Sequence, residues 1–189
     1  MRVARLNRLA AIFGAAALAG FAAPAIAETI VVDQSSVAAC ASAASIGRVD
    51  GASLQVCGEA IAQSGLSHHD LVATYVNRGR ISMHRRDYAS ALADFDRAIE
   101  LEPTAGEAWV DRGATAILQH RYMDGVADTT KGIELGVRDP AKAYFNRAVA
   151  EERLGDEQSA YVDYQQAMVL QPGWDAPKQE LLRFTVTRR

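Results

Sequence analysis

The residues best suited to chemistry are charged side chains that recur at one spacing along the chain. An Asp follows an Arg by sixteen residues in the pairs Arg78 with Asp94, Arg112 with Asp128, and Arg147 with Asp163. A row of carboxylates could serve acid–base catalysis, but the guanidinium fork also matches a carboxylate in a structural ion pair. We favour structural pairs that join two helices, over a solvated charged face and over catalysis.

A short polar segment, His68-His69-Asp70, is the one local cluster of metal-ligand residue types. Neighbouring histidines usually point in different directions, so we interpret the segment as a polar loop rather than a metal site. The sequence has no zinc-ligand spacing, no phosphate-binding glycine loop and no nucleophile motif. We therefore expect no metal, no cofactor and no enzymatic activity. A hydrolase acting at this segment is the least favoured alternative.

The first 27 residues have the pattern of a signal peptide. They combine a basic start (Arg2, Arg5, Arg8), an apolar run over 9–23 and the small-x-small sequence Ala25-Ile26-Ala27. We predict cleavage before Glu28 and export to the periplasm of a Gram-negative bacterium. The alternative, a membrane-spanning helix, needs about 20 apolar residues, so we expect no stable membrane insertion after cleavage.

Charge and cysteine content fit an exported product. The signal segment carries three of the 20 basic residues and none of the 23 acidic ones, so the remainder has a net charge of −6. That balance argues against nucleic acid, which needs a basic surface. Cys40 and Cys57 are expected to form a disulfide in an oxidising compartment, worth about 3 kcal/mol in the chain-entropy model. A redox or metal-binding pair is a minor alternative.

Internal repeats organise the rest of the chain. The segment Tyr75–Gly79 is similar to Trp109–Gly113 and to Tyr144–Ala148, with starts 34 and 35 residues apart. Further along, Ala91, Phe95, Ala98 and Pro103 correspond to Ala160, Tyr164, Ala167 and Pro172. Small residues let two helices approach, aromatic residues fill the remaining volume, and each proline ends a helix. The repeat therefore predicts a pair of antiparallel helices.

This pattern resembles the tetratricopeptide repeat family over about residues 72–174. The resemblance implies an all-α fold, a right-handed superhelix of antiparallel helix pairs. We expect repeats at 72–105, 106–140 and 141–174, after an N-terminal helical cap at 28–71 that holds a half-repeat and both cysteines. A C-terminal capping helix and tail would occupy 175–189, because the end of a stack needs covering.

The middle repeat departs from the family pattern. Gly125, Thr129 and Gly132 stand where Ala, an aromatic residue and Ala are usual. A glycine inside a helix costs about 1 kcal/mol relative to Ala. We therefore predict that the helix near 122–134 is the weakest element.

In the family, the first helix of each repeat lines a concave groove, which implies a partner-binding surface here. The positions assigned to it are Val76, Asn77, Arg80, Met83, Val110, Asp111, Ile117, Phe145, Asn146 and Val149. An apolar stripe of this kind suits an extended peptide or an amphipathic helix, while Asn77, Asp111 and Asn146 could bond to a ligand main chain. The alternatives are inter-repeat core, or a stripe covered by the C-terminal helix.

The resemblance implies a non-enzymatic adaptor or scaffold of the bacterial cell envelope that binds a protein or peptide. The groove does not match the carboxylate-clamp type, because Val76, Arg80, Phe145 and Val149 stand at the clamp positions. An accessory factor that binds peptidoglycan or another glycan is the alternative. Self-association through the same groove is also open.

Overall fold

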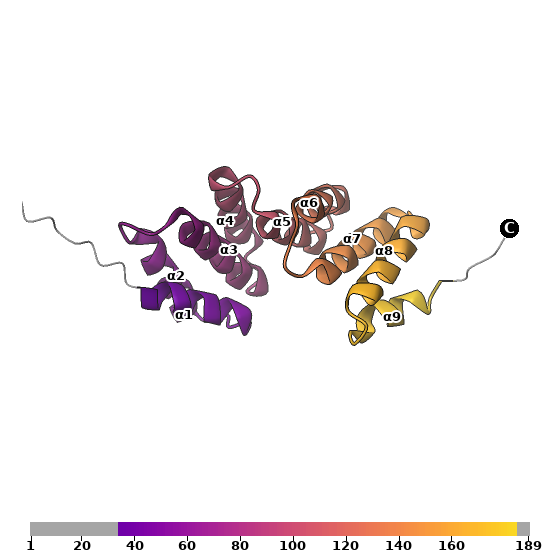
Figure 1. Cartoon of the computed structure of the whole chain (residues 1–189), viewed down its shortest axis with the longest axis horizontal. Coiled ribbons are helices and arrows are strands. Elements are labelled where there is room, and N and C mark those ends of the chain that lie inside the picture. The colour runs from indigo at the N-terminus through magenta and orange to yellow at the C-terminus, as the bar shows by residue number, and fades with distance from the viewer. Residues whose placement is uncertain (1–33, 185–189) are drawn as a thin grey trace, which may run out of the picture.

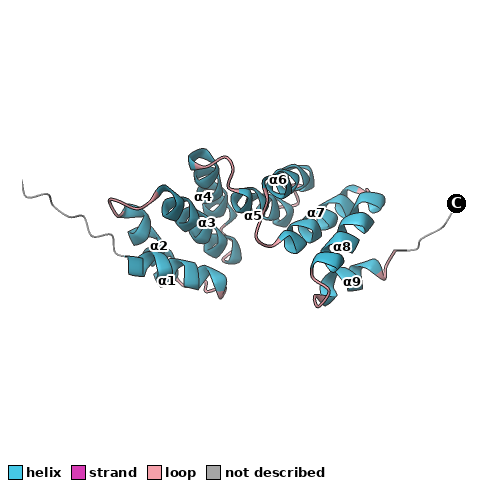
Figure 2. Ribbon diagram, in the orientation of Figure 1, coloured by secondary structure: helices cyan, strands magenta, loops and turns pink. Residues whose placement is uncertain are grey.

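The computed structural model describes residues 34–184, in which every regular element is a helix (Figures 1 and 2). The helices are α1 (Gln34–Ser45), α2 (Gly51–Ala62), α3 (His68–His84), α4 (Tyr88–Leu101), α5 (Gly106–Leu118), α6 (Tyr122–Leu135), α7 (Pro140–Leu154), α8 (Glu157–Leu170) and α9 (Asp175–Leu181). The predicted signal peptide, residues 1–27, lies outside the described residues. Within 34–184 no helix has the length and apolar character that a bilayer crossing requires.

The helices pair in sequence and the pairs stack into an arc. Each hairpin (α1–α2, α3–α4, α5–α6, α7–α8) contacts the next, and α9 packs on α8. The first helices of successive hairpins also touch, α1 with α3, α3 with α5 and α5 with α7. Figure 1 shows α4 and α6 on the outer side of the arc. The predicted all-α fold of stacked antiparallel helix pairs is confirmed, and α2, the predicted half-repeat, is completed by α1.

Local sequence explains where the helices begin. In α2, α3, α4, α7 and α8, the side chain of the N-cap residue accepts a hydrogen bond from a backbone N–H of the first turn. These N-cap residues are Asp50, Ser67, Asp87, Asp139 and Asp156. Such caps satisfy donors that the helix itself leaves free.

The turn inside each of the three later hairpins uses one left-handed residue. These residues are Arg86 (φ 63°), His120 (φ 62°) and Gly155 (φ 83°). A left-handed residue ends a helix by redirecting the chain, and glycine does so without a side-chain clash. The 34- and 35-residue spacing of these residues shows that the repeat extends to backbone conformation.

The N-terminal hairpin is held by the disulfide between Cys40 and Cys57, whose Cα atoms are 4.9 Å apart. Both cysteines are fully buried and form a cluster with Ile81 of α3. The cross-link therefore fixes α1 to α2 at the place where the hairpin packs on the first full repeat.

Glycines bring α5 and α6 together in the middle repeat. A Cβ at Gly113 would stand 2.6 Å from Thr129 Oγ1, and one at Gly132 would collide with Val110 and stand 2.7 Å from the Gly106 carbonyl oxygen. A Cβ at Gly125 would collide with Ile117. The glycines that the sequence presents as a cost to α6 are thus also the means of its close packing on α5.

Candidate binding cleft on the concave surface

A cleft of about 800 Å³ opens on the inner side of the arc. We call it the concave cleft. Its lining comes from α1, α3, the α4–α5 turn, the start of α5 and the α6–α7 loop: Ala41, Ser42, Ser45, His69, Val72, Ala73, Val76, Asn77, Arg80, Glu102, Thr104, Ala105, Gly106, Glu107, Gly136 and Arg138. Clefts of this size are usual for ligand sites.

Three of the predicted groove residues line the concave cleft: Val76, Asn77 and Arg80. They lie on one face of α3 because their spacing follows the helical period. Val76 is buried in its floor, at 5% exposure, whereas Asn77 and Arg80 are half-buried. The helix α3 therefore contributes both apolar and polar side chains to the cleft.

Asp111 of α5 lies beside this face and binds Arg80. Arg80 donates from Nε to Asp111 Oδ2 at 2.6 Å, and the Asp111 side chain is 15% exposed. Burial raises the pKa of Asp111 above its ordinary value, and the charge of Arg80 opposes that rise. Two predicted groove residues thus neutralise each other across the first helices of neighbouring repeats.

A second ion pair lies between the start of α5 and the α6–α7 loop, with the Arg138 side chain exposed to solvent. Arg138 donates to Glu107 Oε1 from Nε at 3.1 Å and from its backbone nitrogen at 3.3 Å. Burial raises the pKa of Glu107, but hydrogen bonds from its own backbone and from Arg138 outweigh burial and lower it overall. The extended loop is therefore tied to the start of α5.

The Arg–Asp pairs predicted from the sixteen-residue spacing lie between the two helices of each hairpin. Each guanidinium forms two hydrogen bonds to its carboxylate: Arg78 to Asp94 at 2.9 and 2.6 Å, Arg112 to Asp128 at 2.7 and 2.7 Å, and Arg147 to Asp163 at 2.6 and 3.0 Å. None of these residues lines the concave cleft. Their place between helices is that of structural pairs.

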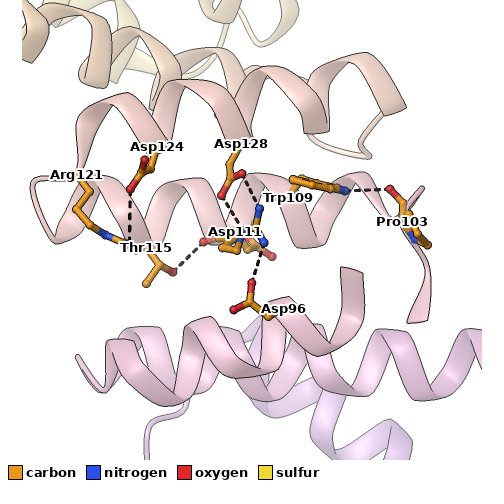
Figure 3. Close-up of polar contacts among 9 residues, drawn as sticks. Asp96, Pro103, Trp109, Asp111, Thr115, Arg121, Asp124 and Asp128 are labelled. Carbon is orange, nitrogen blue, oxygen red and sulfur yellow. Dashed lines mark hydrogen bonds and ion pairs between the residues drawn. The ribbon is translucent and has the colours of Figure 1, made fainter. Parts of the chain in front are cut away.

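Each of these arginines also lies near the aromatic residue three positions earlier. The distance from the guanidinium carbon to the ring centroid is 5.5 Å for Arg78 and Tyr75, 4.6 Å for Arg112 and Trp109, and 5.4 Å for Arg147 and Tyr144. Figure 3 shows Asp96 and Asp128 on helices to either side of α5. The aromatic residue, the Arg and the Asp form one unit that recurs in every full repeat.

Val110, Ile117 and Met83 do not line the concave cleft. The groove assignment is wrong for Val110, which is buried, whereas Ile117 and Met83 are half-buried and keep part of their surface exposed. Val110 is 9% exposed and packs where a side chain at Gly132 would stand. Ile117 packs likewise against Gly125, and Met83 packs against the core around Phe95. Because α6 approaches α5 so closely, α6 covers Val110 and part of Ile117.

Phe145 and Val149 are half-buried and share a core cluster with Leu181 and Phe184, which supports the alternative that the C-terminal segment covers part of the stripe. The Phe145 ring lies 4.8 Å from the Trp174 ring and 5.4 Å from the Tyr164 ring, centroid to centroid. Phe145 and Val149 both pack on the core cluster that includes Tyr164. Asn146 is half-buried and does not line the concave cleft.

An ion pair fixes the cap over this third repeat. Arg183, just after α9, donates to Glu152 of α7 at 2.8 Å, and Glu152 also accepts from the Tyr164 hydroxyl at 3.0 Å. The concave cleft thus includes no residue of α7, and its lining ends at the α6–α7 loop.

The His68-His69-Asp70 segment is the first turn of α3 and not a loop, which corrects that interpretation. Ser67 caps the helix, accepting from the Asp70 backbone at 3.0 Å and donating to the Asp70 carboxylate at 2.8 Å. His69 lines the concave cleft. Among the described residues no group of His, Cys, Asp or Glu side chains is arranged to hold a metal ion.

Sequence reasoning missed two walls of the cleft. One is α1, through Ala41, Ser42 and Ser45, and the other is the loop pair that contains Glu102, Thr104 and Arg138. The cysteine spacing was the available signal for the first, because a Cys40–Cys57 bond brings α1 to the stack. The signal for the second was the segment Gly136-Val137-Arg138-Asp139, which lengthens the turn before Pro140 at the end of the middle repeat.

Comparison with known proteins agrees with this geometry. The tetratricopeptide repeat family profile matches residues 72–105 and 141–173. The Hsp70-Hsp90 organizing protein of Triticum aestivum is 33% identical over 95 residues, which is 50% of this chain and 16% of that protein. The chain spans less than a fifth of the length of the first curated relatives.

Solved structures share the fold at low sequence identity. The first TPR domain of Spaghetti (RPAP3), bound to the HSP90 peptide SRMEEVD, has a TM-score of 0.56 at 19% identity, covering 59% of this chain and 88% of that one. MamA from Desulfovibrio magneticus RS-1 has a TM-score of 0.60 at 18% identity, covering 78% and 82%. The described part of this chain is accordingly a tetratricopeptide-type α-solenoid, with tetratricopeptide repeats at residues 72–105 and 141–173.

Proposed function

We propose that this chain is a non-enzymatic protein–protein interaction module, an adaptor or scaffold that holds a short peptide segment of its partner in the concave cleft. The observation that carries the proposal is the cleft itself, about 800 Å³ in volume and walled by the first helices of successive hairpins. A peptide strand fits a site with an apolar floor at Val76 and hydrogen-bonding groups such as Asn77 at the rim.

The solved neighbours support the ligand class. The TPR domain of Spaghetti was solved with a peptide of HSP90, and a second TPR domain, from human RPAP3, with a peptide of HSP70. Both share the stacked-hairpin fold with this chain. Their ligands are not carried over, because Val76 and Arg80 depart from the clamp that grips a terminal carboxylate.

Export and a place in the bacterial cell envelope are a further part of the proposal. The signal-peptide pattern of residues 1–27 and the buried Cys40–Cys57 disulfide support it, since disulfides persist in oxidising compartments. Glycan binding is less favoured, because the residues that line the cleft include no Phe, Tyr or Trp ring on which a sugar could stack.

The test is selection of peptides from a displayed random library, followed by binding to two matched variants. Ala73→Tyr places a ring inside the concave cleft, whereas Ala93→Tyr places the same ring on the exposed outer side of α4. We expect selected peptides to bind wild type and Ala93→Tyr equally and to lose affinity for Ala73→Tyr. Thermal unfolding checks that both variants keep the fold. Equal binding to folded Ala73→Tyr would move the binding surface elsewhere.

A further inference from the structure

We propose that the concave cleft selects peptides that carry a cationic side chain, and that Glu102 is the carboxylate that pairs with it. The inference rests on the proposed peptide-binding function and adds the chemistry of the ligand. It follows from which charged groups in the cleft already have a partner of opposite charge.

The two arginines of the cleft already have carboxylate partners. Arg80 binds Asp111 at 2.6 Å, and Arg138 binds Glu107 at 3.1 Å. An acidic ligand would have to compete with these internal pairs and lie beside their carboxylates. Asp111 illustrates the cost, because burial raises its pKa and the nearby charge of Glu107 adds to the rise.

The start of α5 is the other place in the cleft that could attract an anion. A helix N-terminus presents free N–H groups and a partial positive charge. Ala105, which precedes α5, supplies no side-chain cap, but the Glu107 carboxylate accepts a hydrogen bond from its own backbone N–H. The chain's own carboxylate thus occupies the position that a ligand carboxylate would take.

Glu102 differs from these groups, which are all paired within the chain. It lines the cleft, and within residues 34–184 its half-buried carboxylate has no hydrogen bond or ion pair. It is also the C-cap residue that follows Leu101 at the end of α4, a helix with no basic residue in its last turn. The carbonyl end of a helix carries a partial negative charge that favours a cation. A Lys or Arg from a ligand would meet both the carboxylate and the helix end.

His69 is the remaining basic side chain of the lining, and it lies at the start of α3. The other polar groups named in the lining, such as Asn77 and Thr104, are neutral. The cleft therefore offers an apolar floor, neutral rim groups and one carboxylate that lacks a partner, which together fit an apolar peptide with a Lys or Arg.

Positional-scanning hexapeptide mixtures test this directly, with the full chain in its disulfide-bonded form. We expect wild type to enrich Lys or Arg over Asp or Glu at one position by about five- to tenfold, the effect of one charge-assisted pair. Glu102→Gln should remove that preference and keep the selected apolar residues. Glu100→Gln, an exposed position on the same helix with the same charge change, should leave it intact. His69→Gln should also leave it intact.

The outcomes separate the inference from the function on which it rests. Enrichment of acidic residues, or a cationic preference that survives Glu102→Gln, overturns the inference while the cleft remains a peptide site. Mixtures that show no enrichment on wild type, or bind equally to Ala73→Tyr, overturn both.

Discussion

Arg112 of α5 donates to Asp96 of α4 at 2.7 Å, so its guanidinium joins two neighbouring repeats (Figure 3). The same group holds Asp128 of its own repeat through two further hydrogen bonds. Arg147 repeats the arrangement and donates to Thr130 of the preceding repeat at 3.1 Å. In a stack in which each repeat touches only its neighbours, such bridges transmit stability along the array.

Replacing the two carboxylates around Arg112 should have unequal effects. Asp128 is 15% exposed and Asp96 is 53% exposed, so solvent screens the second far more. Asp128→Asn should cost about 2–3 kcal/mol in the free energy of unfolding, and Asp96→Asn about 0–1 kcal/mol. Urea unfolding measures both. A loss at Asp96 equal to that at Asp128 would show that the inter-repeat bond dominates.

Alanine at Gly132 should destabilise the protein although alanine is the better helix former. The added Cβ collides with Val110 and approaches the Gly106 carbonyl, so α5 and α6 must separate. We expect a loss of about 1–3 kcal/mol. Gly58→Ala in α2 is the matched control, since a Cβ there meets nothing within 4 Å. It should gain about 0.5–1 kcal/mol. If urea unfolding shows that both variants stabilise the protein, close packing of α5 on α6 does not require a glycine at position 132.

The repeat period and the ion pairs could be predicted because both recur within the chain. Arg78, Arg112 and Arg147 keep one relation to an Asp because a helical hairpin of fixed length places facing side chains sixteen positions apart in the sequence. The burial of Val110 could not be predicted in this way. It depends on how closely α6 approaches α5, which is a tertiary consequence of glycines that local propensity counts only as a cost.

The cleft was predictable in part. One face of α3, with Asn77 and Arg80, follows from helical periodicity. The contribution of Glu102 and Arg138 depends on where two loops lie relative to α5, and no local pattern specifies that position. The covering of Phe145 by Trp174 likewise depends on the path of the chain after α8.

Glu151 should make the protein less stable at neutral pH than in mild acid. Burial, and then the charge of Asp163, raise the pKa of Glu151 to about 7, against the opposing charge of Arg147. One of its carboxylate oxygens is buried without a hydrogen bond among the described residues. The folded state therefore binds more protons than the unfolded state between the ordinary pKa of 4.5 and about 7. In that window stability falls as pH rises, and above it the penalty is constant.

The variant Glu151→Gln removes this penalty. It should raise the free energy of unfolding by on the order of 2 kcal/mol at pH 8 and change it little at pH 4. Glu134→Gln, at an exposed position, should show no such pH dependence. Urea unfolding measured at pH 4 and at pH 8 tests this prediction. An equal effect of Glu151→Gln on the free energy of unfolding at both pH values would show that the Glu151 carboxyl titrates normally.

Removing the disulfide should loosen the N-terminal hairpin and leave the later repeats intact. Cys40→Ala/Cys57→Ala should cost about 3 kcal/mol in the unfolding of α1 and α2, because each repeat depends mainly on its neighbours. Hydrogen exchange would show lower protection in α1 and unchanged protection in α7. Since Ala41 and Ser42 line the cleft, peptide affinity should fall as well. Unchanged protection of α1 would mean that packing on Ile81 suffices without the bond.

The most direct test of the binding cleft is an NMR titration of the isotope-labelled protein with a library-selected peptide. Amide shifts are expected to concentrate at Ala73, Asn77 and Thr104, in the lining of the concave cleft. The competing surface is the set of exposed apolar side chains away from the cleft, such as Met123 and Val162. Shifts confined to those residues, with Ala73 and Asn77 unmoved, would contradict the account.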